Sequence, residues 1–497
     1  MKTRLRILFL SSEVAPFAKT GGLADVSSAL PKALYDMGHD IRVIMPKYGC
    51  INDRKYVLRE VIRLKRVKIK LGENDHIACA KSAFIPDSKV QVYFLEYKPF
   101  FGGNDLYVDP ETGTDLPDNA ERFGLFCKAA LETIKLLHWE PQIIHCNDWQ
   151  TGLVPWYLKH EFNKDPFYAN CSTVLSIHNM AYQGNFTADN LELLGIGDNY
   201  KDGISDLKHH NSINFLKAGI LTADKIVTVS QAYADEVLTD PEIGAGMTDY
   251  LKSRNKDFEG ILNGVDYSEW NPETDSLIAE KYSHNKPESK AHNKLKLLEK
   301  CNFPTNDNKP LIGMVSRLAG QKGFDLLQAA IKDIIALDVR LVILGLGEPA
   351  YHDALQKICK TFPKNVALFL QFDNDLAHLI EAGSDMFLMP SRYEPCGLNQ
   401  MYSLKYGTVP IVRSTGGLKD TIIDYDQDPE NSNGFSFTPY NKKDMVDAIK
   451  RAVAVYNDQK NWQKLIKRGM RADYSWSVAA EKYVKTYLSL VNNKKHK

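Results

Sequence analysis

Apolar and polar residues alternate along the second half of the chain in blocks that predict strands and helices in turn. The expected strands are apolar at most positions, so both of their faces would be buried. Short strands of this kind, each followed by a helical segment, are typical of a parallel sheet covered by helices on both sides. We expect strands at 310–318, 339–346, 366–372, 386–390 and 409–413, and helices at 323–335, 349–359, 376–382 and 398–406.

The first half of the chain repeats this alternation less regularly. A loop-rich stretch at 99–119 interrupts it, and loops of that length inside a compact domain are usually functional or mobile. A charged stretch at 63–70 alternates with aliphatic residues, which favours a half-buried strand over a nucleic-acid patch. The apolar runs predict strands at 5–10, 40–45, 90–95, 142–146, 173–178 and 225–229.

A chain of 497 residues is too long for one hydrophobic core, so two or three domains are expected. The pattern changes near 257–266, between the two series of strands. The sequence therefore predicts an α/β fold with two doubly wound, Rossmann-like parallel-sheet domains that face each other across a deep interdomain cleft. In such sheets ligands bind beyond the carboxyl ends of the strands.

Charge and cysteine content narrow the class of protein further. The 62 basic residues balance the 62 acidic ones, so no nucleic-acid partner is indicated. The eight cysteines are scattered without metal-binding spacing, which fits free thiols in a reducing compartment. No apolar segment is long enough to span a bilayer. We expect a cytoplasmic protein without a membrane partner.

Lys19, Gly21 and Gly22 lie between the first expected strand and an expected helix at 24–34. A glycine turn at a helix start gathers free backbone N–H groups at the positive end of the helix dipole. The glycines would let a ligand approach closely, and the lysine adds a mobile positive charge. The pattern favours an anionic ligand. A turn that only packs helix against strand, with Lys19 in solvent, is the alternative.

Arg317 and Lys322 flank the start of the helix expected at 323–335. Cations are unfavourable at this end of a helix unless an anion is bound there too. A diphosphate held by both side chains would resolve the conflict through charge-assisted hydrogen bonds. The alternative is a pair of solvated surface cations.

Two further strand ends in this half carry candidate chemistry. Glu394 precedes the helix expected at 398–406, where a carboxylate could bind sugar hydroxyls or stabilise developing positive charge. A simple helix-start acid that matches the dipole is the alternative. Thr415 and Gly416 form another glycine turn at a helix start, which is a second position suited to an anion.

In the first half, His178 and Asn179 end one expected strand, and Asp148 and Trp149 follow the strand before it. A lone histidine is more often structural than catalytic. A His-Asn pair and an Asp-Trp pair at neighbouring strand ends, however, would share one edge of the sheet, which favours a functional site.

Taken together and in this order, these motifs resemble those of the glycogen and starch synthases of bacteria and plants, which form glycosyltransferase family 5. The resemblance runs from residue 7 to about residue 487, almost the whole chain. Its segments are Ser12 to Val26, Ile177-His178-Asn179 with Tyr182-Gln183-Gly184, Asn263-Gly264-Val265-Asp266, Ser316-Arg317-Leu318 with Gln321-Lys322-Gly323, Pro390-Ser391-Arg392 to Gly397-Leu398, and Gly416-Gly417-Leu418.

The resemblance implies the GT-B fold and an enzyme that transfers glucose from ADP-glucose to the non-reducing end of an α-1,4-glucan such as glycogen. It implies retention of anomeric configuration, with no metal and no other cofactor. It further implies that a C-terminal helix at 475–497 packs back on the first, acceptor-side domain at 1–257. The nucleotide-sugar-binding domain would then span 258–474.

The same resemblance assigns roles to residues. Lys19, Gly21, Gly22, Arg317 and Lys322 would bind the diphosphate of the donor. Glu394 and His178 would contact the transferred glucose, so the expected catalytic residues are Glu394, His178, Lys322 and Arg317. Phe372, where relatives carry tyrosine, would lie against the adenine. The other expected substrate-binding residues are Asp25, Asp148, Asn179, Asn263, Cys396, Gly397, Leu398, Thr415 and Gly416.

One departure from the family pattern concerns the acceptor side. Relatives usually read His-Asp-Trp-His where this chain has Asn147, Asp148, Trp149 and Gln150.

Three other functions stay open on the sequence alone. They are a retaining GT-B transferase with another donor or acceptor, a phosphorylase that would need a pyridoxal cofactor, and a catalytically silent glucan-binding protein.

Overall fold

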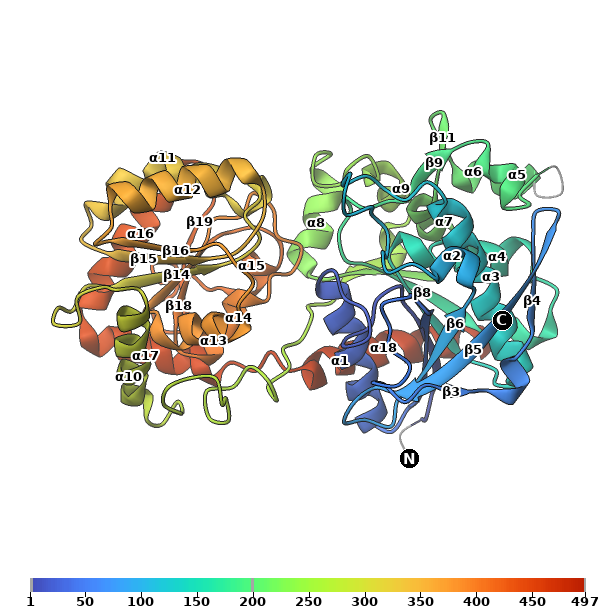
Figure 1. Ribbon diagram of the computed structural model, residues 1–497, viewed down its shortest axis with the longest axis horizontal. Coiled ribbons are helices and arrows are strands. Elements are labelled where there is room, and N and C mark those ends of the chain that lie inside the picture. Colours follow the sequence, from blue (N-terminus) through green and yellow to red (C-terminus); the bar gives the residue numbers. More distant parts are fainter. Residues whose placement is uncertain (1–2, 198–200, 496–497) are drawn as a thin grey trace. The chain divides into compact units, whose positions relative to one another are not determined.

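The computed structural model describes residues 3–197 and 201–495, and the chain divides into two compact units (Figure 1). The first comprises Met1–Val229, Ala234–Gly264 and Trp476–Lys497, and the second comprises Ser230–Tyr233 and Val265–Ser475. The change of unit falls after Gly264, within the stretch at 257–266 where the sequence pattern changes, whereas the family resemblance implies a boundary at 257. The reason is strand β13 (Phe258–Gly260), which pairs in parallel with β12 (Lys225–Thr228) and so extends the first sheet.

The sheet of the first unit has the strand order β13-β12-β8-β7-β1-β2-β6-β5-β3, and β4 also pairs with β5. The chain adds β2 and β6 on one side of β1, and then β7, β8, β12 and β13 on the other side. The carboxyl ends of β1 and β7 therefore form a topological switch point. The strands predicted from the apolar runs are confirmed as β1 (Arg6–Leu10), β2 (Asp40–Pro46), β6 (Gln91–Glu96), β7 (Ile143–Asn147), β8 (Ser172–Ile177) and β12.

The sequence pattern does not predict the antiparallel edge of this sheet in full. The stretch at 63–70 contains a short 3-10 helix, η1 (Ile62–Leu64), and the strand β4 (Val67–Leu71). Aliphatic residues of β4 are buried while Lys68 and Lys70 are exposed, so the half-buried strand is confirmed. The unpredicted strands are β3 (Arg59–Glu60), β5 (Asn74–Phe84), and a small separate sheet of β9 (Asn185–Thr187), β10 (Lys208–His209) and β11 (Ser212–Asn214).

Helices cover the sheet of the first unit, and the C-terminal helix α18 (Trp476–Lys495) lies beside α1 (Gly22–Asp36) in Figure 1. The Tyr487 hydroxyl of α18 is 2.6 Å from Nδ1 of His145 on β7, which ties this helix to the sheet. The other helices are α2 (Lys98–Phe101), α3 (Asn119–Leu136), α4 (Leu153–His160), α5 (Asn190–Leu193), α6 (Lys201–Leu207), α7 (Phe215–Thr222), most of α8 (Gln231–Thr239) and α9 (Thr248–Ser253).

The sheet of the second unit is parallel throughout, with the strand order β16-β15-β14-β17-β18-β19. This is the doubly wound order, and its switch point lies between β14 and β17. The strands are β14 (Leu311–Val315), β15 (Arg340–Leu344), β16 (Val366–Phe369), β17 (Met386–Met389), β18 (Val409–Arg413) and β19 (Phe435–Phe437). All but β19 are strands that the sequence pattern predicts.

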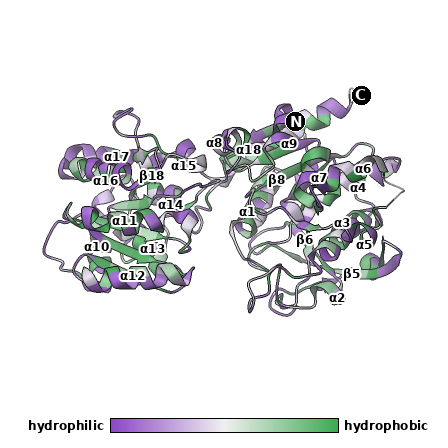
Figure 2. Ribbon diagram, turned by 90° about the horizontal axis from the view of Figure 1, so that it is seen from above, coloured by the Kyte–Doolittle hydropathy of each residue, from purple (hydrophilic) through white to green (hydrophobic). Residues whose placement is uncertain are grey.

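The apolar residues of the second sheet alternate between two cores. Leu341 and Ile343 of β15 join one buried cluster, and Val342 and Leu344 join another, so both faces are covered (Figure 2). This confirms the prediction drawn from strands that are apolar on both faces. The helices are α10 (Lys290–Lys300), α11 (Phe324–Ile335), α12 (Pro349–Thr361), α13 (Asn374–Gly383), α14 (Asn399–Lys405), α15 (Gly416–Thr421), α16 (Lys442–Asn457) and α17 (Gln459–Arg471).

Candidate active site

The loop between β1 and α1 is organised by Glu13, a residue that the sequence analysis does not single out. Glu13 is 3% exposed, and its carboxylate accepts hydrogen bonds from the Thr20 N–H (2.5 Å), the Thr20 hydroxyl (2.6 Å) and the Gly21 N–H (3.2 Å). A carboxylate here also suits the positive end of the α1 dipole. The protein therefore supplies its own anion at this turn, and the Gly21 N–H is already in use.

Lys19 and Asp25, both expected to bind substrate, form an ion pair with each other. Lys19 Nζ lies 2.7 Å from Asp25 Oδ1, and the side chains are 54% and 41% exposed. Exposed pairs contribute only about 0–1 kcal/mol, so Lys19 could exchange this partner for another anion at little cost. A Cβ atom at Gly21 or Gly22 would meet no atom within 4 Å, so packing does not require glycine at either position.

The ends of β7 and β8 bring Asp148 and His178 together, as their places in the sequence suggest. The backbone N–H of His178 donates to Asp148 Oδ1 (2.7 Å), and the backbone N–H of Asp148 donates to the Ser176 carbonyl (2.8 Å). Asp148 has a φ of +55°, a conformation that costs a non-glycine residue on the order of 1–2 kcal/mol. The two hydrogen bonds hold this strained turn in place.

Burial raises the pKa of Asp148 to about 7, the His178 N–H opposes the rise, and the negative charge of Glu13 adds to it. The unfolded carboxyl has a pKa of about 3.9, so the native state binds this proton more tightly and stability falls as the pH rises from about 4 to about 7. We expect Asp148→Asn to be more stable than the unaltered protein by on the order of 3 kcal/mol at pH 7.5, and equally stable at pH 4. Urea unfolding at both pH values measures this, and a difference independent of pH would contradict it.

Three more polar residues on or after strands of the first sheet differ in their roles. His145 is fully buried between the hydroxyls of Tyr487 and Ser176, both at 2.6 Å, and burial lowers its pKa to about 3. Asn179 Oδ1 accepts a hydrogen bond from the Ala181 N–H (3.0 Å), which stabilises the turn that begins at Asn179. Asn263 is 7% exposed, and its Oδ1 has no hydrogen-bond partner among the residues that the structure describes. An unpaired buried oxygen of this kind costs about 1–3 kcal/mol, which a donating ligand would offset.

The long loop at 99–119 is held in place by the buried guanidinium of Arg122 on α3. Arg122 is 2% exposed and donates to the carbonyls of Phe100 (2.8 Å) and Leu106 (3.0 Å). Next to them, the Tyr107 hydroxyl lies 2.6 Å from Ser12 Oγ and 2.9 Å from Glu13 Oε1. The loop therefore reaches the carboxyl end of β1, and Tyr107 is a second site residue that the sequence analysis missed.

In the second unit, Lys322 and Glu394 form an ion pair with a 2.6 Å separation between Nζ and Oε2. Lys322 lies just before α11, after β14, and Glu394 follows β17, so the switch point brings them together. The Glu394 side chain is 8% exposed, and the Ser391 hydroxyl also donates to it (2.9 Å). A cation is unfavourable at the start of a helix, and the carboxylate of Glu394 offsets this for Lys322 at the start of α11.

Two glycines with positive φ allow the backbones around this pair to approach closely. Gly323 has a φ of +79°, and a Cβ there would lie 2.1 Å from the Pro390 carbonyl oxygen. Gly416 has a φ of +45°, and a Cβ there would lie 2.0 Å from the Glu394 carbonyl oxygen. Only glycine fits at either position, so these two turns fix where Lys322 and Glu394 lie.

The segment after Glu394 turns sharply into α14. Cys396 is 7% exposed, Gly397 has a φ of +69°, and Leu398 precedes the first residue of the helix. The Gly417 N–H donates to the carbonyls of Glu394 (3.1 Å) and Pro395 (3.2 Å). The buried turn at Thr415 and Gly416, expected to suit an anion, thus serves in this structure as a support for the Glu394 segment.

Arg317 and Phe372 complete the carboxyl edge of the second sheet. Arg317 is exposed, and no hydrogen bond or ion pair of its side chain occurs within residues 3–197 and 201–495. Phe372 follows β16 and is 89% exposed. A free cation and an exposed aromatic ring at a strand-end edge are features that binding surfaces share.

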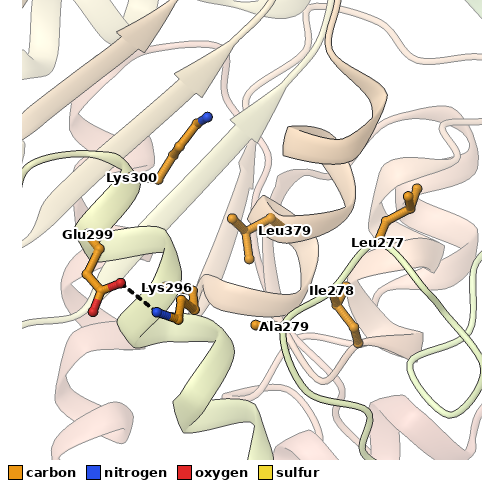
Figure 3. Close-up of a pocket in the computed structure, with 7 residues that line it drawn as sticks. All are labelled: Leu277, Ile278, Ala279, Lys296, Glu299, Lys300 and Leu379. Atoms are coloured by element: carbon orange, nitrogen blue, oxygen red, sulfur yellow. Dashed lines mark hydrogen bonds and ion pairs between the residues drawn. The ribbon is translucent and has the colours of Figure 1, made fainter.

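A shallow cavity of about 480 Å³ lies elsewhere in the second unit and contains none of the expected site residues (Figure 3). It opens between the segment before α10, α10 itself and α13, and the ion pair between Lys296 and Glu299 (2.9 Å) lies at its rim. The residues that line it are Leu277, Ile278, Ala279, Lys296, Glu299, Lys300 and Leu379.

Over 3–197 and 201–495, no cluster of three or more His, Cys, Asp or Glu side chains could hold a metal ion. Among the helices described there, none is long and apolar enough to cross a membrane. All eight cysteines are free thiols.

Comparison with known proteins identifies the family. The model of the starch synthase catalytic domain matches residues 6–253, and that of glycosyl transferases group 1 matches residues 298–469. The glycogen synthase of Geotalea daltonii is 43% identical over 97% of this chain and 98% of its own length. That of Clostridium novyi is 43% identical over 98% of this chain and 100% of its own.

Solved structures agree with these matches. The catalytic domain of starch synthase IV from Arabidopsis thaliana, bound to ADP and acarbose, superposes with a TM-score of 0.88 at 32% identity, over 99% of this chain and 100% of that one. A sucrose-phosphate synthase from Thermosynechococcus elongatus shares the fold at 18% identity and a TM-score of 0.58. This chain therefore belongs to the family of glycogen and starch synthases, which are glycosyltransferases of the GT-B fold.

Proposed function

We propose that this protein transfers glucose from ADP-glucose to the non-reducing end of an α-1,4-glucan such as glycogen, with retention of configuration and without a metal ion. The observation that carries the proposal is the Lys322–Glu394 pair at the switch point of the second sheet, with the exposed Arg317 after the same strand as Lys322. Breaking the bond between glucose C1 and phosphate leaves negative charge on the diphosphate and positive charge on the sugar. Cations at the strand ends and the buried Glu394 carboxylate match these opposite charges.

The donor diphosphate is proposed to bind Lys19, Arg317 and Lys322. Its oxygens would replace Asp25 as the partner of Lys19 and share Lys322 with Glu394. Gly21 and Gly22 would leave room for the phosphates to approach the start of α1. Because the Gly21 N–H already bonds to Glu13, we expect backbone donation to begin at Gly22.

The sugar and the base are assigned to the neighbouring strand ends. Glu394 and the segment Cys396–Gly397–Leu398 would hold the transferred glucose, together with His178. Phe372 offers an exposed ring to the adenine. The remaining donor and acceptor contacts are proposed for Asp25, Asp148, Asn179, Asn263, Thr415 and Gly416. The eight free thiols support a reducing compartment, and we propose the cytoplasm.

Release of nucleoside diphosphate tests the proposal. The purified protein is mixed with glycogen and either ADP-glucose or UDP-glucose, and reactions without glycogen serve as controls. Glycogen-dependent release of ADP, with little release of UDP, would support it. Release of UDP alone would mean that the donor is UDP-glucose and not ADP-glucose. Release of neither nucleotide would favour a glucan-binding protein without activity.

Gly22→Ala is expected to weaken donor binding without weakening the fold. The added methyl group meets no atom within 4 Å in the free protein. Alanine also has a higher helix propensity than glycine, so the first turn of α1 should not be destabilised. The methyl group would instead occupy the space through which a phosphate reaches α1, so we expect the KM for ADP-glucose to rise about tenfold or more. Initial rates against donor concentration and thermal melting measure the two effects. An unchanged KM would remove Gly22 from the donor site.

A further inference from the structure

We propose that Asn147 is a positioning residue that fixes the tautomer of His178, so that the ring presents a hydrogen-bond acceptor to the transferred sugar. This rests on the proposed function, in which His178 contacts that sugar. Asn147 ends β7, at one of the two positions where the family resemblance led us to expect histidine. No other role for Asn147 follows from the sequence.

The orientation of the Asn147 amide is determined by the strand next to it. Its Nδ2 donates to the carbonyl oxygen of Leu10, the last residue of β1, at 2.9 Å. A carbonyl oxygen accepts hydrogen bonds and cannot donate them. Turning the amide over would set two acceptors, Asn147 Oδ1 and the Leu10 oxygen, against each other. Asn147 is fully buried, so water cannot separate them, and Oδ1 must point away from Leu10.

Oδ1 of Asn147 lies 3.0 Å from Nε2 of His178. Because an amide oxygen only accepts, the proton of this hydrogen bond must reside on Nε2. Burial lowers the pKa of His178 to about 4, so the ring is neutral near pH 7 and carries a single proton. Nδ1 is therefore left with its lone pair.

Among residues 3–197 and 201–495, the other groups around His178 do not compete for its ring. Asp148 Oδ1 accepts the backbone N–H of His178, and His145 uses both ring nitrogens on Ser176 and Tyr487. With Nε2 committed to Asn147, Nδ1 is the ring nitrogen that a ligand can reach on this half-buried side chain. An acceptor at Nδ1 selects a ligand group that donates, which in a glucosyl donor is a sugar hydroxyl.

The tautomer can be read directly, without substrate, from nitrogen chemical shifts in the full chain labelled with ¹⁵N-histidine. His178→Gln identifies the two signals of His178 by their loss. We expect a protonated Nε2 and an unprotonated Nδ1 in the unaltered protein at pH 7. A protonated Nδ1 would overturn the proposal.

Two variants separate positioning from packing. Asn147→Leu removes both hydrogen bonds, and we expect both tautomers to appear and kcat to fall about tenfold. Asn147→Asp replaces the Nδ2 donor with an oxygen that faces the Leu10 carbonyl and, once ionised, places a carboxylate beside Nε2, which raises the pKa of His178. Below that raised pKa, Nδ1 becomes a donor, so this variant should lose activity toward low pH relative to the unaltered protein. Identical pH profiles, or an Asn147→Leu variant with unchanged shifts and kcat, would contradict the proposal.

Thr228→Val is the matched control. The buried Thr228 hydroxyl donates to the Ile177 carbonyl (2.8 Å), beside His178, without touching its ring. This variant should lose a comparable hydrogen bond yet keep the shifts of His178 and the kcat of the unaltered protein. If the unaltered protein releases no ADP, the proposed function fails, whereas the tautomer is still decided by the shifts.

Discussion

Arg317→Ala and Lys322→Ala are each expected to lower turnover about a hundredfold, because each removes a cation that would neutralise the leaving diphosphate. Their effects on folding should differ. Arg317 is exposed and forms no ion pair among residues 3–197 and 201–495, so its loss should leave the free energy of unfolding unchanged. Loss of Lys322 leaves the buried Glu394 carboxylate without this cation, although the Ser391 hydroxyl still donates to it, and this should cost about 1–3 kcal/mol.

A third variant isolates the ion pair. In Lys322→Ala with Glu394→Gln, the buried charge is gone, so much of the lost stability should return while turnover stays low. Urea unfolding and ADP release with glycogen measure the two properties on the same samples. Near-normal turnover in either single variant would remove that cation from the catalytic machinery. Equal stability of the two single variants would contradict the structural role of the pair.

The order of strands explains why the sequence reveals the site residues but not their partners. The strands before Lys19, Asp148, Arg317 and Glu394 could be placed from apolar runs, because a strand buried on both faces is distinct from a helix. Lys322 and Glu394, however, meet because β14 and β17 are neighbours in space, and the chain places two strands between them. No local pattern records that adjacency.

Glu13 and Tyr107 were missed for a related reason. Glu13 follows the apolar run of β1 and, from pattern alone, resembles any exposed acid after a strand. Its function depends on a loop folding back so that Thr20 and Gly21 reach it, and on Tyr107 arriving from 94 residues away. A bound anion was inferred at the starts of α1, α11 and α15. In the free protein Glu13 accepts hydrogen bonds at the first, Glu394 pairs with Lys322 beside the second, and the third supports the Glu394 segment.

The second large effect is expected for Gly416→Ala. A Cβ at this position would lie 2.0 Å from the Glu394 carbonyl oxygen, and the φ of +45° adds strain for any residue but glycine. The backbone that carries Glu394 must move to admit the methyl group. Since a displacement of about 1 Å in a catalytic group can cost about a hundredfold in rate, we expect turnover to fall at least that far and stability to fall by about 2–4 kcal/mol.

Gly38→Ala separates backbone strain from collision. Gly38 has a φ of +95°, yet a Cβ there would meet nothing within 4 Å, and the residue lies after α1, away from the expected site residues. Its replacement by alanine should lower the free energy of unfolding only by the strain of a left-handed backbone, about 1–2 kcal/mol, and should leave turnover unchanged. If Gly416→Ala loses no more stability and activity than this control, then the turn at Gly416 does not position Glu394. A larger loss in both would show that the carboxylate is held by the close approach of these two backbones, rather than by its ion pair with Lys322 alone.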